Sequence, residues 1–576
     1  MEEKQKNNRN YNVFFNTHTV SGIVISVGLF VCFFAGSFAL FLDNINRWEN
    51  NTIKGEYRED IDFERALALV KADGYNLNDR TINMGYREGA NPFIYVSSGA
   101  LKVEADSITG KKYSSERDSI SKSGFYFMIG PDTYEVRSKE FIRDREHLGS
   151  YLYALHYFEP IPVVGIYIAG FVALFFLFAI ITGIIVHWQK IISNFFTFRL
   201  KATIKNLWTD AHTALGVIGI PFQFMYAVTG AFYGLSLLVY LPTLLFVFDG
   251  DTDKMISSVF PNIINLEKSG EQLVERADIN KLTESYLKEL DDLEVENVFL
   301  NVINYNNSNA HITFTANIDT ESHFFNSTFS IYRLSDGTLV KQKPLSENAY
   351  EGSVLSVVRN LHFAQYGGYF IKGIYFLLAM ITCFVIISGV MIWLAAREKK
   401  MYEHRKKFNT YVGAIYLGLC LGLYLAIAFF FCLTKILPAE MANRFDIMTA
   451  MFYSFWFGYT VYAYFSKNYF RITKNALIAA GILGIIIPVL NGIHSGLWFW
   501  KSLPLGYMDS FFIDVSWLVM GVITLIAAYK SKPTHKKEKP VGKEHSVERG
   551  QKSKIPVMSK ERVKEPILVA RSSQGI

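Results

Sequence analysis

About eight apolar segments, each long enough to cross a bilayer, constrain this chain more than any other feature of its sequence. Runs of about 20 apolar residues with almost no charge are typical of spanning helices, because only a helix satisfies its own backbone hydrogen bonds in hydrocarbon. Half of the 576 residues are apolar, with 48 Phe and 33 Tyr among them, which excludes a soluble protein. The sequence therefore predicts a membrane protein built on an all-α transmembrane bundle of about eight helices.

The spans divide the chain into membrane and extramembrane parts. In chain order we expect a cytoplasmic amino terminus (1–17), a first span (18–42), an extracytoplasmic domain (43–155), a second span (156–187) and a cytoplasmic loop (188–211). These are followed by a third span (212–248), a second extracytoplasmic domain (249–360), a fourth span (361–396), four further spans (411–529) and a disordered basic cytoplasmic tail (530–576). In both extracytoplasmic parts a helical stretch, Phe63–Val70 or Glu271–Leu290, precedes segments that alternate like strands. We therefore expect two small α+β domains.

Positive charge predicts the orientation of the chain. Residues 397–407 hold six basic residues against two acidic ones, and Lys467, Arg471 and Lys474 follow the sixth span. Cytoplasmic connections carry an excess of Lys and Arg, so we expect both termini in the cytoplasm. The tail is rich in Lys and Glu; contact with anionic membrane lipid is one reading of this composition, and simple solubility is the other.

Two patterns of histidine and glycine each occur twice. In one pattern a histidine opens an apolar helix, and glycines follow it at the fourth and eighteenth positions. In the other, Leu-His precedes an apolar helix that carries Thr-Gly or Ser-Gly near its end. The first pattern comprises His18, Gly22 and Gly36, then His212, Gly216 and Gly230; the second comprises His156 and Gly183, then His362 and Gly389.

The duplication predicts how the histidines pair. Each unit contains two spans, so the second unit starts on the same side of the membrane as the first and the repeats are parallel, related by a pseudo-two-fold axis along the membrane normal. His18 and His212 then lie together at the inner helix ends, and His156 and His362 at the outer ends.

Two facing imidazoles suggest haem. Neutral imidazole is a standard axial ligand of haem iron, and two of them make a six-coordinate centre suited to electron transfer. Small residues beside the ligands would let a flat macrocycle slide between helices, and we expect Gly22, Gly36, Gly216 and Gly230 to provide this space. The alternative for a lone histidine is an interfacial polar residue, and the alternative for the glycines is close helix packing.

Two further histidines have open roles. His187 ends the second span, where it would replace His18 or His212 as a ligand, hydrogen-bond a haem propionate, or mark the interface beside Trp188. His494 lies in the seventh span between Gly492 and Gly496; a packed or substrate-facing role and a metal role are both open.

Several sequence signatures are missing. The chain has no Gly-x-Gly-x-x-Gly after a strand, no Walker loop and no His-Glu-x-x-His, which argues against a nicotinamide or flavin domain and against ATP-driven transport. The four cysteines show no paired spacing, so no disulfide framework or thiolate metal site follows. No nucleic-acid partner is expected.

The duplicated pattern resembles the PepSY-associated transmembrane family, iron-regulated membrane proteins that include bacterial ferric-siderophore reductases. The resemblance covers about residues 11–396 and rests on the histidines and glycines of both patterns. Asp106–Gly110 and Asp336–Gly337 stand in the place of the acidic turn of the PepSY domain. The resemblance implies two b-type haems, reduction of Fe(III) chelates on the periplasmic face and a location in the bacterial inner membrane.

We therefore expect a haem-dependent ferric-siderophore reductase supplied by an unidentified cytoplasmic or quinol electron donor. His18 with His212 would bind the inner haem, and His156 with His362 the outer haem. One alternative is a membrane-anchored binding or regulatory module without redox activity. Another is a transporter of an iron chelate, which the four extra spans would serve.

Overall fold

The computed structural model describes residues 2–52, 61–72, 75–87, 93–96, 125–129, 136–139, 147–188, 204–259, 262–264, 266, 269, 271–273, 275–290, 295–318, 327–343, 350–397, 404–438 and 441–532. The predicted turn Asp106–Gly110, the tail beyond residue 532 and most of the loop 188–211 lie outside these residues.

The chain is a multi-pass membrane protein. Among its described residues, seven helices are long and apolar enough to cross a membrane. They are α1 (Glu2–Ala39), α6 (Gly165–His187), α8 (Ile204–Gly234), α13 (Gly368–Ala396), α14 (Lys406–Ile436), α16 (Tyr469–Ser495) and α18 (Met508–Lys530). The remaining predicted span is also a helix, α15 (Arg444–Ser466). Tyrosines such as Tyr453, Tyr459 and Tyr462 make it less apolar than the other seven.

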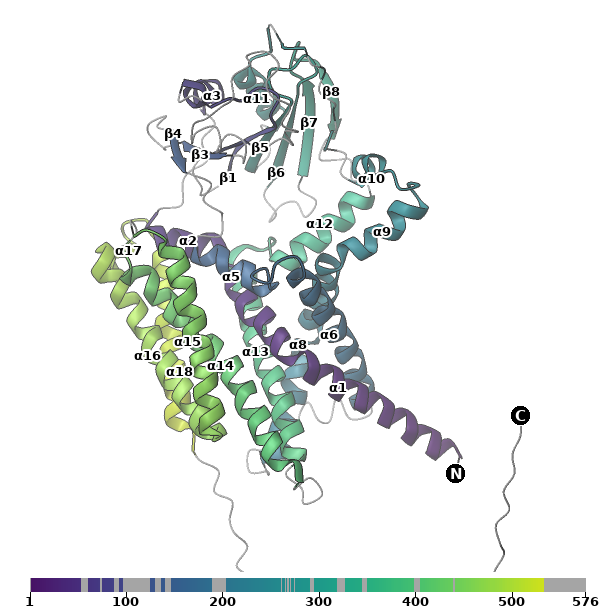
Figure 1. Cartoon of the computed structure of the whole chain (residues 1–576), viewed down its shortest axis with the longest axis vertical. Helices are drawn as coiled ribbons and strands as arrows, with labels where there is room; N and C mark the ends of the chain where they lie inside the picture. Colours follow the sequence, from purple (N-terminus) through teal and green to yellow (C-terminus); the bar gives the residue numbers. More distant parts are fainter. Residues whose placement is uncertain are drawn as a thin grey trace, which may run out of the picture. The chain divides into compact units, whose positions relative to one another are not determined.

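Four helices form a closed ring. α1 packs on α6, α6 on α8, α8 on α13 and α13 on α1. The first repeat contributes α1 and α6 and the second contributes α8 and α13, so the ring has the two-fold arrangement that the duplication predicts. α14, α15, α16 and α18 pack on one another as a second group, and α14 contacts both α1 and α13 (Figure 1).

Several predicted boundaries differ from those in the structure. Residues 2–17, expected to precede the first span, already belong to α1. His156 and His362 do not open spans; they lie at the ends of two short helices, α5 (Leu148–His156) and α12 (Tyr350–Phe363). Tight turns with positive φ at Phe158, Val163 and Gly367 separate these helices from the spans.

The third predicted span also ends early. α8 stops at Gly234, and a separate helix, α9 (Ser236–Phe246), precedes α10 (Thr252–Val259). Gly170 and Gly234 explain the close crossing of α6 and α8, since a Cβ built on Gly234 would lie 2.4 Å from the Cα of Gly170. The short helices α2 (Leu42–Asn50) and α17 (Phe499–Ser502) follow α1 and α16.

Both predicted α+β halves are present, and their strands form one sheet. Its strands are β1 (Ile82–Arg87), β2 (Phe93–Val96), β3 (Phe125–Ile129), β4 (Val136–Lys139), β5 (Val295–Ile303), β6 (His311–Ile318), β7 (Ser327–Arg333) and β8 (Leu339–Lys343). The eight strands are antiparallel in the order β4-β3-β2-β1-β5-β6-β7-β8. In each repeat the first strand lies at the centre of the sheet and the following strands are added outward, so the two halves have the same order.

The centre of the sheet joins the two repeats. β1 pairs with β5, with Ile82 opposite Val302 and Met84 opposite Leu300, and these buried side chains share one core with α3 (Phe63–Ala72) and α11 (Ile279–Lys288). The helix predicted at Glu271–Leu290 is shorter than expected, because α11 begins only at Ile279. Gln272 instead forms a β-bridge to Asn307, and the side chain of Asp278 caps the start of α11.

The β1–β5 pairing makes Gly85 sensitive to substitution. A Cβ at this position would lie 2.3 Å from the backbone oxygen of Val298. We expect Gly85→Ala to destabilise the sheet by about 1–3 kcal/mol, the usual cost of overpacking, and to speed hydrogen exchange at the amides of β1 and β5. Gly458→Ala on α15, where a Cβ meets no atom within 4 Å, is the control. Equal behaviour of the two variants would contradict this reading.

Candidate functional site

His18 on α1 and His212 on α8, the first pair, come together between helices of the ring. Their ring centroids are 6.3 Å apart and their planes are inclined at 73°. A metal lies roughly 2 Å from a ligating imidazole nitrogen and the ring centroid roughly 1 Å behind it, so two rings on one metal have centroids about 6 Å apart. The first pair therefore has the separation that one shared metal requires.

A neighbouring helix orients each ring of the first pair. His18 Nδ1 donates to the carbonyl oxygen of Ala179 on α6 at 2.8 Å. His212 Nδ1 lies 3.0 Å from the carbonyl oxygen of Val385 and 3.0 Å from Ser388 Oγ, both on α13. A carbonyl only accepts, so Nδ1 carries the proton in both rings. Nε2 is left with a lone pair for a metal, and such a second hydrogen bond is what fixes a ligating histidine.

Glycines allow these rings to lie against the helices. A Cβ on Gly183 would lie 3.0 Å from Cε1 of His18, and a Cβ on Gly389 would lie 3.2 Å from Cε1 of His212. Each glycine follows by four residues the carbonyl that accepts the hydrogen bond. The duplicated Thr-Gly and Ser-Gly motifs thus form equivalent surfaces against which the two rings of the first pair pack.

His156 and His362, the second pair, lie at the ends of α5 and α12. Tyr153 connects them, because its ring centroid is 5.0 Å from that of His156 and 6.4 Å from that of Phe363, the neighbour of His362. His156 Nδ1 contacts the carbonyl oxygen of Tyr153. A Cβ on Gly36 would lie 3.8 Å from the Cβ of His156, so α1 passes directly beside this histidine.

His362 has a hydroxyl as its partner. Its Nδ1 lies 2.9 Å from Thr229 Oγ1, which itself donates to the carbonyl oxygen of Met225 at 2.9 Å. The hydroxyl proton is therefore used, and Nδ1 of His362 donates to Thr229. The rings of Tyr226 and Tyr233 each lie 5.1 Å from that of His362 and enclose it.

Burial keeps the second pair neutral. It lowers the pKa of His156 to about 4, against the opposing effect of the Tyr153 carbonyl. Burial, together with the smaller effect of the nearby His156, lowers the pKa of His362 to about 3. Both rings are thus neutral at pH 7, with one ring nitrogen protonated and the other free to ligate a metal.

The two pairs lie at different levels along α1. His18 is near the middle of this helix and Gly36, beside His156, is near its end, so the rise of a helix places these two residues roughly 27 Å apart. That distance is close to the thickness of the hydrocarbon core of a bilayer.

The paired histidine nitrogens are suited to a metal ion that is already bound by other ligands. Within the described residues no group of three or more His, Cys, Asp or Glu could hold a metal ion. The first pair supplies two nitrogens at the separation of two ligands on one metal, as a planar macrocycle would need, and His156 and His362 lie within electrostatic range of each other. A Cβ on Gly22 would meet no atom within 4 Å, and one on Gly216 only Val385 Cγ1 at 4.0 Å, so there is space beside the first pair.

The remaining predicted residues fall in different places. Gly230 packs against Ala173 on α6 and does not mirror the contact of Gly36 with His156. His187 lies on α6 one turn beyond Gly183, within electrostatic range of both His18 and His212. His494 is exposed near the end of α16, in the second group of helices.

Sequence reasoning missed the residues that surround the second pair. Thr229, Tyr226 and Tyr233 share with His212 one face of α8, at helical spacing. This spacing was the signal that could have identified them. The hydroxyl partner of His362, however, has no counterpart in the first repeat, where alanine occupies the position that precedes Gly36.

The family model described as PepSY-associated TM region matches residues 15–396. The match includes both repeats and all four paired histidines, and it ends before α14. No curated protein matches the chain.

Thr229 and Ser388 offer a matched comparison. Thr229 is the one described hydrogen-bond partner of the His362 ring, whereas the His212 ring keeps the Val385 carbonyl if Ser388 is removed. We expect Thr229→Val to lower the free energy of unfolding by about 1–3 kcal/mol, the cost of an unsatisfied buried donor, and Ser388→Ala to have a smaller effect. Denaturation in detergent measures both; a larger loss in Ser388→Ala would show that the ring orientation is misassigned.

Proposed function

The chain belongs to the PepSY-associated transmembrane family, and on this premise we propose that it is a two-haem electron-transfer protein that reduces a ferric chelate. It would act in the bacterial cytoplasmic membrane as an oxidoreductase. The observation that carries the proposal is the 6.3 Å separation of the His18 and His212 rings, together with Nδ1 hydrogen bonds that leave Nε2 available in both.

Each histidine pair would hold one b-type haem. His18 with His212, and His156 with His362, would ligate the two haems, which would supply a one-electron Fe(III)/Fe(II) couple. The chain supplies the ligands, fixes their tautomers and keeps water out with aromatic walls such as Tyr226 and Tyr233. His187, beside the first pair, is placed to hydrogen-bond a propionate.

The basic helix ends support an orientation with the first pair at the cytoplasmic face. Arg397, Lys407, Lys467 and Arg471 lie at the ends of α13, α14, α15 and α16 that alternating spans put on the side of His18. The positive-inside rule favours the cytoplasm for that side. The second pair and the eight-stranded sheet would then belong to the opposite side.

The proposed substrate is Fe(III) held by hard oxygen ligands, as in a siderophore. One electron reduces it to Fe(II), whose lower charge weakens its hold on these ligands, and iron is released. The chain carries no nicotinamide or flavin signature, so the electron would come from a separate cytoplasmic or quinol donor.

Haem content tests the ligand assignment directly. We expect two haems per chain in the wild type by pyridine haemochrome, and about one in His212→Ala and in His362→Ala, because each removes one of two axial ligands. His494→Ala, at an exposed position in the second helix group, should retain both. A wild-type protein without a Soret band would leave a membrane-anchored binding module as the better description.

Iron reduction tests the activity itself. In vesicles with reductant enclosed on the first-pair side and a ferric chelate outside, a ferrous-iron indicator should report reduction. We expect His212→Ala and His362→Ala to slow the reduction by more than roughly 100-fold, because removal of a metal ligand lowers activity more than removal of a residue that only hydrogen-bonds the ligand. Chelate uptake without any reductant would instead favour transport.

A further inference from the structure

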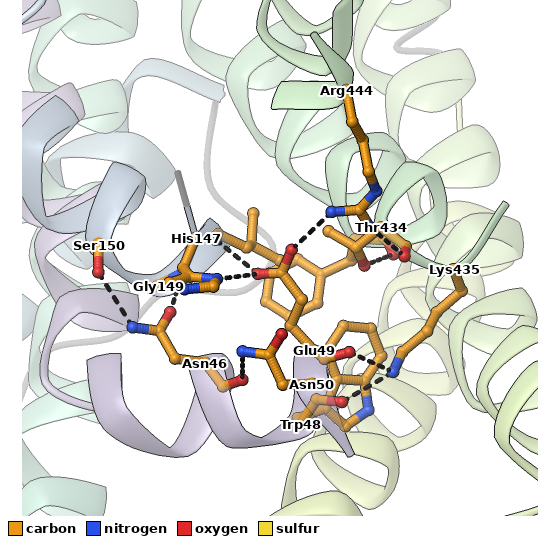
Figure 2. A network of polar contacts seen from close by, with 12 residues as sticks. Asn46, Trp48, Glu49, Asn50, His147, Gly149, Ser150, Thr434, Lys435 and Arg444 are labelled. Atoms are coloured by element: carbon orange, nitrogen blue, oxygen red, sulfur yellow. Dashed lines mark hydrogen bonds and ion pairs between the residues drawn. The ribbon is translucent and has the colours of Figure 1, made fainter. Parts of the chain in front are cut away.

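Glu49, in the last turn of α2, lies where the ends of three helices meet (Figure 2). Its side chain is only 3% exposed. Oε2 accepts the backbone N–H of Leu148, the first residue of α5, at 2.7 Å, and Oε1 accepts from Arg444 at 3.2 Å. The imidazole of His147 lies 4.0 Å from Oε2. A buried carboxylate is costly unless paired, so these contacts hold it in one place.

The Glu49 carboxylate caps the start of α5. The first N–H groups of a helix have no partner within the helix, and the helix dipole favours negative charge there. Asn46, one turn earlier on α2, accepts the next N–H, that of Gly149, at 2.9 Å. A nine-residue helix is marginal by itself, so its direction depends on its cap and on packing. α2 thus determines where α5 begins.

Two cations from the second helix group hold this junction together. Arg444, at the start of α15, also donates to the carbonyl oxygens of Thr434 and Leu437 at the end of α14. Lys435 on α14 donates to the carbonyl oxygens of Trp48 and Glu49 at 2.7 and 3.2 Å, which caps the end of α2 (Figure 2). The start of α5 and the ends of α2 and α14 are therefore each satisfied by a side chain from another helix.

Further contacts attach α2 and α5 to the same group. Asp514 on α18 accepts from the indole of Trp48 at 2.8 Å, and Asp509 on α18 pairs with Arg47. On α5, the ring of Tyr151 lies 5.4 Å from that of Phe430 and 5.6 Å from that of Phe445. These contacts come from helices that lie beyond the region of the family match.

α5 ends at His156, roughly 12 Å along the helix from its capped first residue. We propose that Glu49 is a positioning residue for His156, and that the second helix group fixes this member of the second pair through Arg444 and Lys435. The inference rests on the two-haem function proposed above. The proposal gives a role to α14 and α15, which carry none of the four paired histidines.

The proposal predicts an effect confined to one haem. His18, His212 and His362 are oriented by Ala179, Val385 and Thr229, which all lie within the ring of four helices. Glu49 touches none of these residues in the described contacts. Loss of Glu49 should therefore change the second haem and spare the first, whereas general destabilisation would affect both.

Glu64 in the sheet domain provides a matched control. It also accepts the first N–H of a helix, that of Ile279 at 2.8 Å, and pairs with an arginine, Arg276, at 2.5 Å. Glu64→Gln therefore removes the same kind of cap and ion pair from a helix that carries no proposed ligand.

The experiment compares Glu49→Gln, Arg444→Gln, Glu49→Asp and Glu64→Gln in the full chain with haem bound. We expect Glu49→Gln to speed hydrogen exchange of the α5 amides by about tenfold or more, as loss of a charged hydrogen bond implies. It should also shift the low-spin spectrum and potential of one haem only. Arg444→Gln should do so more weakly, Glu49→Asp should restore part of the signal, and Glu64→Gln should change α11 exchange alone.

The outcomes separate this proposal from the two-haem function. Two haems with unchanged spectra in Glu49→Gln, or equal changes in both haems, would overturn the positioning role and leave the function intact. Absence of haem from the wild-type protein would contradict the proposed two-haem function. In that case the α5 amides still test the contact itself, because unchanged hydrogen exchange in Glu49→Gln would show that Glu49 does not hold α5. Faster α5 exchange without any change at the second haem would likewise overturn the role assigned to Glu49.

Discussion

The structure depends on how four partly buried imidazoles satisfy their hydrogen-bonding groups within the protein. A buried N–H without a partner costs free energy, so each ring must donate from one nitrogen. In all four histidines that nitrogen is Nδ1, and its partner is a backbone carbonyl or a hydroxyl whose own proton is already used. The same bonds fix the direction of Nε2. Ring orientation and metal-binding capacity therefore have one physical cause.

The two-fold arrangement appears in the membrane and in the sheet. In the ring of four helices it makes Ala179 and Gly183 equivalent to Val385 and Gly389 around the first pair. In the sheet it places β1 beside β5, so that two domains inserted far apart in the chain share one core. A pairing of central strands buries the edges that separate domains would have left open. Duplication thus provides both the paired histidines of the helix ring and one sheet that the two repeats share.

Much of this could be predicted from sequence because repeated spacing is a strong signal. The matching positions of His18 and His212 predicted that these two rings come together. The contacts of Gly183 and Gly389 with the rings were not predicted, because they join helices whose mutual rotation the sequence does not give. The joined sheet could not be predicted, because the alternation of Ile82, Met84 and Tyr86 in β1 indicates which face of the strand is buried and not which strand lies beside it. α15 was expected as a span although its tyrosines make it less apolar. The role of Glu49 depends on contacts between helices far apart in the chain, which no local pattern records.

The two pairs are supported in different ways, and the difference bears on function. The first pair is held by equivalent backbone carbonyls of α6 and α13, and Ser388 adds a contact to His212 alone. In the second pair, His362 relies on Thr229 of the ring, whereas His156 ends a short helix fastened by charges from α2, α14 and α15. Under the function proposed above, a haem that only relays electrons would need no adjustable support. A haem that meets a substrate would benefit from a ligand that can be positioned separately. α14 and α15 contact α5, the helix that ends at His156, and could act there.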